Sequence, residues 1–311
     1  MKMIGTDVLI ATAGPAPEEP NGSSLRERAA SVLSAAVPPP VMLLLAIVSM
    51  QLGAAVSTKL FATLGAGGTI FFRLAFSAVF LALAARPALR TIRASQWRAI
   101  GVLGFAIALM NVPFYLAIAR IPLGVASAIQ FVGPLVVGLA TSRRPRDFLW
   151  LAMAGGGIAI LSGDIGRSLD TTGVSWALFA AAGWAAFILA SKWVGRIASG
   201  GSGLPLSLAA AAIFACPFYF TDPNFGHVDW LAIGGAAVVA ILSTALPLSL
   251  EVAALKRLPA RAYSVLVTLE PVTAAIVGLI LLGQPLDIRI SAAILLICLA
   301  SLGVTLFDRA R

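Results

Sequence analysis

Two long apolar runs, separated by a single arginine, indicate how this chain folds. Residues 99–119 read AIGVLGFAIALMNVPFYLAIA, residues 121–142 read IPLGVASAIQFVGPLVVGLATS, and neither run contains a charged residue. A helix needs about 20 mostly apolar residues to cross the hydrocarbon core of a bilayer, and each run reaches that length. The alternating pattern that membrane strands require is absent. Each run therefore predicts one transmembrane helix, and Arg120 lies in the connection between them.

The composition extends this interpretation to the whole chain. Of the 311 residues, 59% are apolar and 11% are charged, and the mean hydropathy is +0.97. Soluble domains carry about 25% charged residues, so the composition argues against a soluble globular protein. The net charge of +9 does not indicate nucleic-acid binding, because the basic residues stand singly or in short clusters between apolar runs. We therefore expect an all-α integral membrane protein with no nucleic-acid partner.

The same length criterion predicts ten transmembrane helices, and the charges predict their orientation. The helices fall at residues 40–62, 69–86, 99–117, 122–141, 148–164, 172–191, 204–220, 230–250, 261–282 and 288–307. Residues 1–39 have the composition of a flexible tail. Of the 22 basic residues, seventeen lie on the side of the N-terminus, whereas the opposite connections hold only Arg120, Arg167 and Arg289. Because basic residues gather on the cytoplasmic side, both termini should be cytoplasmic.

An internal repeat divides the predicted helices into two units, residues 40–165 and 172–308. Residues 120–134 read RIPLGVASAIQFVGP and residues 257–271 read RLPARAYSVLVTLEP. At a constant offset of 137, Arg120, Pro122, Ser127 and Pro134 match Arg257, Pro259, Ser264 and Pro271. The alternative is chance matching of prolines. Five helices per unit is an odd number, so the units should be inverted in the membrane, an architecture typical of secondary transporters by fold-level analogy.

Four ionisable side chains lie within apolar segments, where a charge costs about 2.5–3.5 kcal/mol at the helix centre. Arg73 can hold a carboxylate with two parallel hydrogen bonds, and it is our candidate for the α-carboxylate of an amino acid; snorkelling to the outer interface is the alternative. Lys59 is a second candidate, nearer the outer surface, where snorkelling is the simpler explanation. Glu270 lies near mid-membrane and could carry a proton or bind an ammonium group, unless it forms a structural pair with Arg73 or Lys59. Glu251 is a weaker candidate for the same roles, since a salt bridge with Lys256 or Arg257 would explain it.

Further polar and aromatic side chains could line the same site. Asn111, Tyr115 and Gln130 could hydrogen-bond the substrate, with interhelical hydrogen bonding as the alternative. Trp184 could form a wall of the cavity or simply pack. Pro134 and Pro271 are predicted to break their helices, because proline donates no backbone hydrogen bond.

No motif predicts a metal, a cofactor or an enzymatic reaction. The two cysteines, Cys216 and Cys298, lie in apolar runs and are too far apart in sequence for a zinc motif. The single histidine, His227, lies between Asp222 and Asp229 in an outer connection, and a metal site there is a weak alternative. No Gly-x-Ser-x-Gly or His-Glu-x-x-His motif is present.

Several of these stretches resemble one known family. The residues that carry the resemblance are 110–116 (MNVPFYL), 121–124 (IPLG), 133–135 (GPL), 142–148 (SRRPRDF), 241–247 (ILSTALP) and 270–271 (EP). The chain resembles the drug/metabolite transporter superfamily, with two EamA-type five-helix units, and within it the bacterial threonine/homoserine exporters. The likeness extends from about residue 40 to residue 307. Where those exporters usually carry a glutamate before Phe-x-Gly-Pro, this chain has Gln130.

The resemblance implies proton-coupled export of small hydrophilic amino acids, threonine or homoserine in kind, across the bacterial cytoplasmic membrane. The expected partners are then an amino acid, protons and the lipid bilayer, with formation of a homodimer left open. One alternative is an exporter of other metabolites or drugs, which a larger and more aromatic cavity would favour. The other is a membrane-embedded enzyme or scaffold that transports nothing, which converging nucleophile and base side chains would favour.

Overall fold

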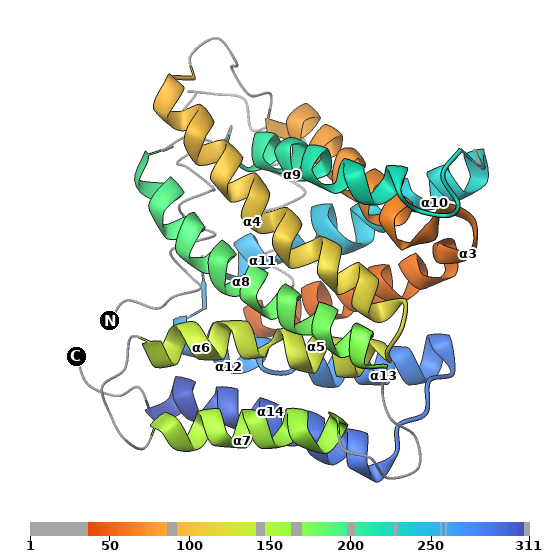
Figure 1. Cartoon of the computed structure of the whole chain (residues 1–311). Helices are drawn as coiled ribbons and strands as arrows, with labels where there is room; N and C mark the ends of the chain where they lie inside the picture. Colours follow the sequence, from red (N-terminus) through yellow and green to blue (C-terminus); the bar gives the residue numbers. More distant parts are fainter. Residues whose placement is uncertain are drawn as a thin grey trace.

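The computed structural model describes residues 37–85, 92–140, 147–162, 170–197, 203–226, 229–255, 257–258 and 260–307, and every regular element in these ranges is a helix. In chain order the helices are α3 (Pro39–Ala85), α4 (Ala94–Ile118), α5 (Leu123–Gln130), α6 (Val132–Ala140), α7 (Asp147–Ser162), α8 (Thr171–Ile197), α9 (Gly203–Phe220), α10 (Trp230–Ala240), the π-helical turn η2 (Ile241–Ala245), α11 (Leu246–Leu255), α12 (Ala260–Val267), α13 (Glu270–Leu282) and α14 (Ile288–Phe307). The all-α expectation is confirmed (Figure 1).

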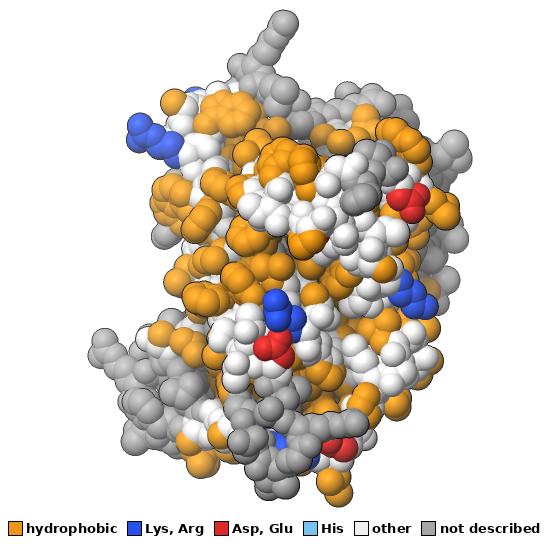
Figure 2. Space-filling model, turned by 45° about the vertical axis from the view of Figure 1, so that its right-hand side comes forward, with side chains coloured by type: hydrophobic (Ala, Val, Ile, Leu, Met, Phe, Trp, Pro, Cys, Tyr) orange, Lys and Arg blue, Asp and Glu red, His pale blue; other side chains and the backbone are white. Residues whose placement is uncertain are grey.

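Within the described ranges, six helices are long and apolar enough to cross a membrane. They cover Pro39–Ala85, Ala94–Ile118, Thr171–Ser191, Gly203–Phe220, Trp230–Leu255 and Val265–Leu282, and shorter apolar helices cover Leu123–Val137 and Ile288–Gly303. Their surface agrees with a lipid environment. Figure 2 shows apolar side chains over much of one face, and residues such as Ile280, Ile213 and Leu83 are 72%, 69% and 68% exposed. An apolar surface of this extent would cause aggregation in water, whereas lipid tails cover it at no cost.

The longest helix, α3, bends sharply and contains two of the predicted spans. Gly65 interrupts it with φ 67° and ψ 173°, which is not a helical conformation. An L-residue with a side chain rarely adopts such a positive φ, so glycine permits the bend. The bend divides α3 into an N-terminal part and a C-terminal part, and the C-terminal part carries Arg73.

Two other predicted spans, 122–141 and 261–282, are interrupted. Phe131 separates α5 from α6, and Thr268 and Leu269 separate α12 from α13. Phe131 and Thr268 lie 137 positions apart, which is the offset of the sequence repeat. Each break comes just before a proline, where the helix lacks one backbone donor.

The helices pack closely because small residues lie at their crossings. Helix α4 packs between α8 and α9, α5 packs against α13, and α7 packs against α14 (Figure 1). At the crossing of α4 with α8, a Cβ atom added to Gly183 would lie 2.3 Å from the carbonyl oxygen of Leu109. Only glycine permits this approach, as is common between membrane helices.

Four contacts join connections or helix ends that the charge pattern predicts on the outer side. They are Gly67 with Asp222 (3.1 Å), Arg120 with Asp170 (3.0 Å), Leu123 with Gln284 (2.9 Å) and Ile160 with Arg289 (2.6 Å). The connections from α4 to α5, from α9 to α10 and from α13 to α14 all lie on the right in Figure 1. The predicted topology requires these connections to lie on one side of the molecule, and the four contacts agree with that requirement. That this side faces away from the cytoplasm stays a prediction. The cytoplasmic clusters predicted at residues 86–90 and 143–146 lie outside the described residues.

Candidate functional site

Arg73 lies on the C-terminal part of α3, and its half-buried guanidinium faces α4. Its Nη1 donates a hydrogen bond to Oδ1 of Asn111 (3.0 Å), and its Cζ lies 5.2 Å from the centroid of the Tyr115 ring. Its Nε is buried and makes no hydrogen bond. Among the residues that the structure describes, no carboxylate forms an ion pair with Arg73. A buried donor without an acceptor is costly, so this guanidinium is suited to receive an anion from a ligand.

Asn111 is oriented by its own helix. Its Nδ2 donates to the carbonyl oxygen of Ile107, one turn earlier on α4, at 2.9 Å. One N–H of the amide is used in this bond, which orients the group so that Oδ1 accepts from Arg73. Helix α4 thus fixes one of the hydrogen bonds that orient the guanidinium.

Tyr115 is held by Ser57, a residue that no sequence motif marks. Its hydroxyl lies 2.8 Å from Oγ of Ser57 on α3, and that Oγ lies 2.7 Å from the carbonyl oxygen of Gly53. Because Ser57 has one hydroxyl proton and Gly53 offers only an acceptor, Ser57 donates to Gly53 and Tyr115 donates to Ser57. The Tyr115 ring is 1% exposed, so this chain of hydrogen bonds fixes an aromatic surface beside Arg73.

Glu270 begins α13, directly after the break in that span. The residue is 8% exposed, and within the described part of the chain its carboxylate makes no hydrogen bond or ion pair. Its backbone oxygen accepts a hydrogen bond from Nε2 of Gln51 on α3 (3.2 Å), and the same nitrogen lies 3.5 Å from Oγ of Ser127 on α5. Gln51 therefore connects α3 with the two interrupted spans.

The contacts of Glu270 and those of the Arg73 site reach α3 at different depths. Gln51 contacts the backbone of Glu270, whereas Ser57 holds Tyr115 beside Arg73. Gln51 and Ser57 are six residues apart, which is about 9 Å along a helix axis at 1.5 Å per residue. Among the described residues, Glu270 forms no ion pair with Arg73 or Lys59, and Lys59 is exposed on α3. Because the carboxylate and the ammonium of an α-amino acid are attached to one carbon, this separation favours different roles for Arg73 and Glu270.

The remaining candidates surround these two groups without joining them. Gln130 ends α5, and its Nε2 donates to the carbonyl oxygen of Met110 (3.3 Å). Trp184 on α8 is half-buried and packs edge-on against Phe131, at the break between α5 and α6, with ring centroids 5.5 Å apart. Glu251 on α11 accepts a hydrogen bond from the hydroxyl of Tyr263 on α12, and Lys256 lies outside the described residues.

Metal binding gains no support from the described residues. They contain no group of three or more His, Cys, Asp or Glu side chains that could hold an ion, while His227 lies outside the described part. Both cysteines are free thiols, with Cys298 buried on α14 and Cys216 half-buried on α9.

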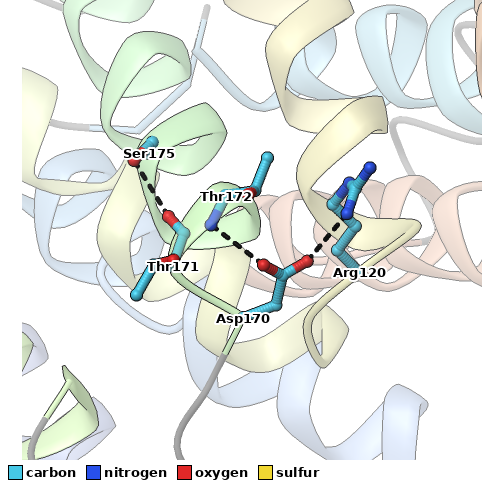
Figure 3. Close-up of polar contacts among 5 residues, drawn as sticks. All are labelled: Arg120, Asp170, Thr171, Thr172 and Ser175. Atoms are coloured by element: carbon cyan, nitrogen blue, oxygen red, sulfur yellow. Dashed lines mark hydrogen bonds and ion pairs between the residues drawn. The ribbon is translucent and has the colours of Figure 1, made fainter.

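Arg120 and Asp170 join, at the start of α8, two connections that the charge pattern predicts on the outer side (Figure 3). Oδ2 of Asp170 accepts a hydrogen bond from Nη1 of Arg120 (3.0 Å), and Oδ1 accepts one from the backbone N–H of Thr172 (3.0 Å). The hydrogen bond from Arg120 is the main reason that the pKa of Asp170 lies below its ordinary value. Any stability from this pair is therefore present above the ordinary pKa of an aspartate and is lost as the pH falls through the lowered one.

Asp170→Asn should leave transport unchanged. The two side chains are 51% and 35% exposed, and solvent screens exposed ion pairs strongly. We expect the transport rate and the thermal midpoint in detergent to match those of the wild-type protein at neutral pH. A large loss of transport in a stable, membrane-inserted Asp170→Asn variant would show that this contact takes part in the transport cycle.

Comparisons with known proteins agree with these features. Residues 171–306 match the EamA-like transporter family. The threonine/homoserine exporter RhtA of Escherichia coli (strain K12) is 39% identical over 275 residues, and RhtA of Salmonella typhimurium (strain LT2) is 38% identical over 273 residues. Both alignments cover 87% of this chain and 92% of the exporter.

One solved structure, described as "Crystal structure of protein", has a TM-score of 0.50 to this chain with 17% sequence identity. The match covers 87% of this chain and 99% of that one. At this identity the likeness concerns the fold alone. The sequence relatives are transporters, not enzymes, and they match nearly their whole length. With its all-helical fold and its long apolar helices, the chain belongs to the EamA-like transporter family.

Proposed function

We propose that this chain exports small hydrophilic amino acids, threonine or homoserine in kind, across the bacterial cytoplasmic membrane. The observation that carries the proposal is the guanidinium of Arg73, which is held by Asn111 and Tyr115 but paired with no carboxylate of the described residues. It offers a planar set of donors to the carboxylate that every α-amino acid carries. The two relatives reported above are exporters of threonine and homoserine, which have this group.

The proposed architecture is ten transmembrane helices in two inverted units, residues 40–165 and 172–308. Two observations support it: α3 bends at Gly65, and two spans are broken 137 residues apart. Helices broken near mid-membrane are typical of substrate and ion sites in inverted-repeat transporters. Gln51 contacts both interrupted spans, one from each unit, so the two units would meet at this residue.

We assign proton coupling to Glu270. Its carboxyl group is buried beside the break in its span and has no cation partner among the described residues. At the position where related exporters usually carry a glutamate, this chain has Gln130, whose amide already donates to Met110. An amide carries no titratable proton, which leaves Glu270 as the better candidate.

A cysteine placed in the loop of Arg143–Arg146 should resist an impermeant thiol reagent in intact cells. The reason is the excess of basic residues on that side, which predicts a cytoplasmic loop. The experiment uses a Cys216→Ser, Cys298→Ser background, so that the new thiol is the only one. Pro285→Cys, in the exposed connection between α13 and α14, is the positive control and should react. The reverse labelling pattern would overturn the orientation.

Two rival functions make different predictions about substrates. An exporter of drugs or other metabolites would not need an α-carboxylate, and a scaffold or enzyme would transport nothing. The proposal does not require a homodimer, because the side chains of Arg73, Asn111 and Tyr115 all come from one chain.

Exchange in proteoliposomes tests the proposed substrate class. Vesicles loaded with unlabelled threonine should take up labelled threonine, and external homoserine should compete. The amino alcohol 1-amino-2-propanol, which lacks the carboxylate, should not compete. Protein-free liposomes are the control. Absence of exchange, or equal competition by the amino alcohol, would contradict the proposal.

A further inference from the structure

The connection between α9 and α10 reaches into the bend of α3. Oδ2 of Asp222 accepts a hydrogen bond from the backbone N–H of Gly67 (3.1 Å), and Oδ1 accepts one from the backbone N–H of Asn224 (3.0 Å). A Cβ atom added to Gly65 would lie 2.0 Å from both carboxylate oxygens. The bend thus needs glycine twice, for its positive φ of 67° and for the space that the carboxylate occupies.

The end of α9 and the connection that follows it contact both parts of α3. Nδ2 of Asn224 donates to the carbonyl oxygen of Phe61 before the bend (3.3 Å). After the bend, the ring of Tyr219 stacks on Phe71 with centroids 5.3 Å apart and planes 4° apart, and it meets Phe72 edge-on at 5.3 Å. Phe71 and Phe72 directly precede Arg73. The end of α9 therefore determines where the residues beside Arg73 lie.

We propose that Asp222 is a positioning residue for transport, whose carboxylate keeps the outer side closed by holding the bend of α3 and thereby fixes Arg73. The inference rests on the proposed function of Arg73. Helix α3 and helix α9 fall in different halves of the proposed repeat, and inverted-repeat transporters work by moving one half against the other. A contact between the halves at the outer side must therefore break when that side opens. A carboxylate that accepts from backbone N–H groups at the start of a helix suits a contact that forms and breaks. Each of its hydrogen bonds is strong, but only a few have to break for the side to open.

Accessibility of a buried thiol tests the proposal without any substrate. Thr69 is fully buried, one helical turn beyond Gly65, so Thr69→Cys in the Cys216→Ser, Cys298→Ser background reports opening at the bend. We expect Asp222→Asn and Asp222→Ala to raise its labelling by an impermeant reagent from outside by roughly tenfold or more, as the population shifts toward the open form. Asp229→Asn is the matched control, because Asp229 is an aspartate of the same connection that caps α10 through Leu231 instead of contacting α3.

Exchange kinetics give the second measurement. With Arg73 less well positioned, Asp222→Asn should raise the KM for threonine by roughly tenfold while the maximal exchange rate falls less. Asp229→Asn should change neither. Unchanged labelling of Thr69→Cys in stable Asp222 variants would overturn the proposal. So would a loss of maximal rate at constant KM, which indicates a purely structural role. If the wild-type protein exchanged no threonine, the proposed function would fail, whereas the labelling result would still decide the role of Asp222.

Discussion

Replacing Arg73 with lysine is expected to lower threonine exchange roughly tenfold or more, equivalent to about 1.4 kcal/mol of lost binding free energy. Lysine keeps the positive charge but replaces a planar set of donors with a single ammonium group. It also loses the hydrogen bond to Asn111 and the contact with the Tyr115 ring, which together orient the guanidinium. Arg73→Gln, which removes the charge as well, should lower exchange further. The measurement is initial exchange rate against threonine concentration in proteoliposomes with matched protein content.

The control is Arg120→Lys, which makes the same chemical change at an exposed arginine whose partner is Asp170. It should exchange threonine at the wild-type rate. Normal exchange by a folded Arg73→Gln variant would show that this arginine only extends toward the interface, as snorkelling arginines do.

Glu270→Gln is expected to abolish uphill export driven by a proton gradient while preserving exchange of threonine down its own gradient. Glutamine keeps the size of the side chain and one acceptor oxygen but has no titratable proton. The backbone contact from Gln51 to residue 270 does not depend on the side chain, so the break in the span should be retained. Both transport modes are measured in the same proteoliposome preparation, so the exchange mode serves as an internal control for folding.

The other outcomes assign different roles to the same residues. If uphill export persists in Glu270→Gln, the proton is carried elsewhere, and Glu251 becomes the next residue to test. If both modes vanish in a stable protein, Glu270 binds the ammonium group of the substrate. Glu251→Gln should leave both modes intact, because its carboxylate already accepts a hydrogen bond from Tyr263 and is not needed for coupling.

The helical class and much of the position of the long helices could be predicted from the sequence. A long apolar run in lipid forms a helix because its backbone groups must hydrogen-bond to each other. The sequence also placed breaks near Pro134 and Pro271, and the structure interrupts those spans at Phe131 and at Thr268–Leu269. It did not show that the first two spans meet at a single glycine. The reason is that the conformation of Gly65 depends on Asp222, which lies 157 positions along the chain.

The candidate site was predicted in part. Arg73, Asn111 and Tyr115 stood out one by one as polar or ionisable groups in apolar spans, and the structure brings them together. The sequence could not show that Ser57 holds Tyr115, because serine is common where membrane helices pack together. Nor could it show that Gln51 contacts the two interrupted spans. The buried amide of Gln51, inside an apolar run, was the one sign available. Only the packing of α3 against α4 and α13 showed that Glu270 forms no ion pair with Arg73.

The central claim is tested most directly by uptake of labelled threonine into inverted membrane vesicles that contain this protein. An imposed proton gradient, acid inside, should drive accumulation of threonine above its external concentration. An uncoupler should reduce the internal level to equilibrium, and vesicles without the protein should show neither effect. Equilibration of threonine that the gradient leaves unchanged would contradict proton coupling, and no uptake beyond that of the control vesicles would contradict the proposed export of threonine itself.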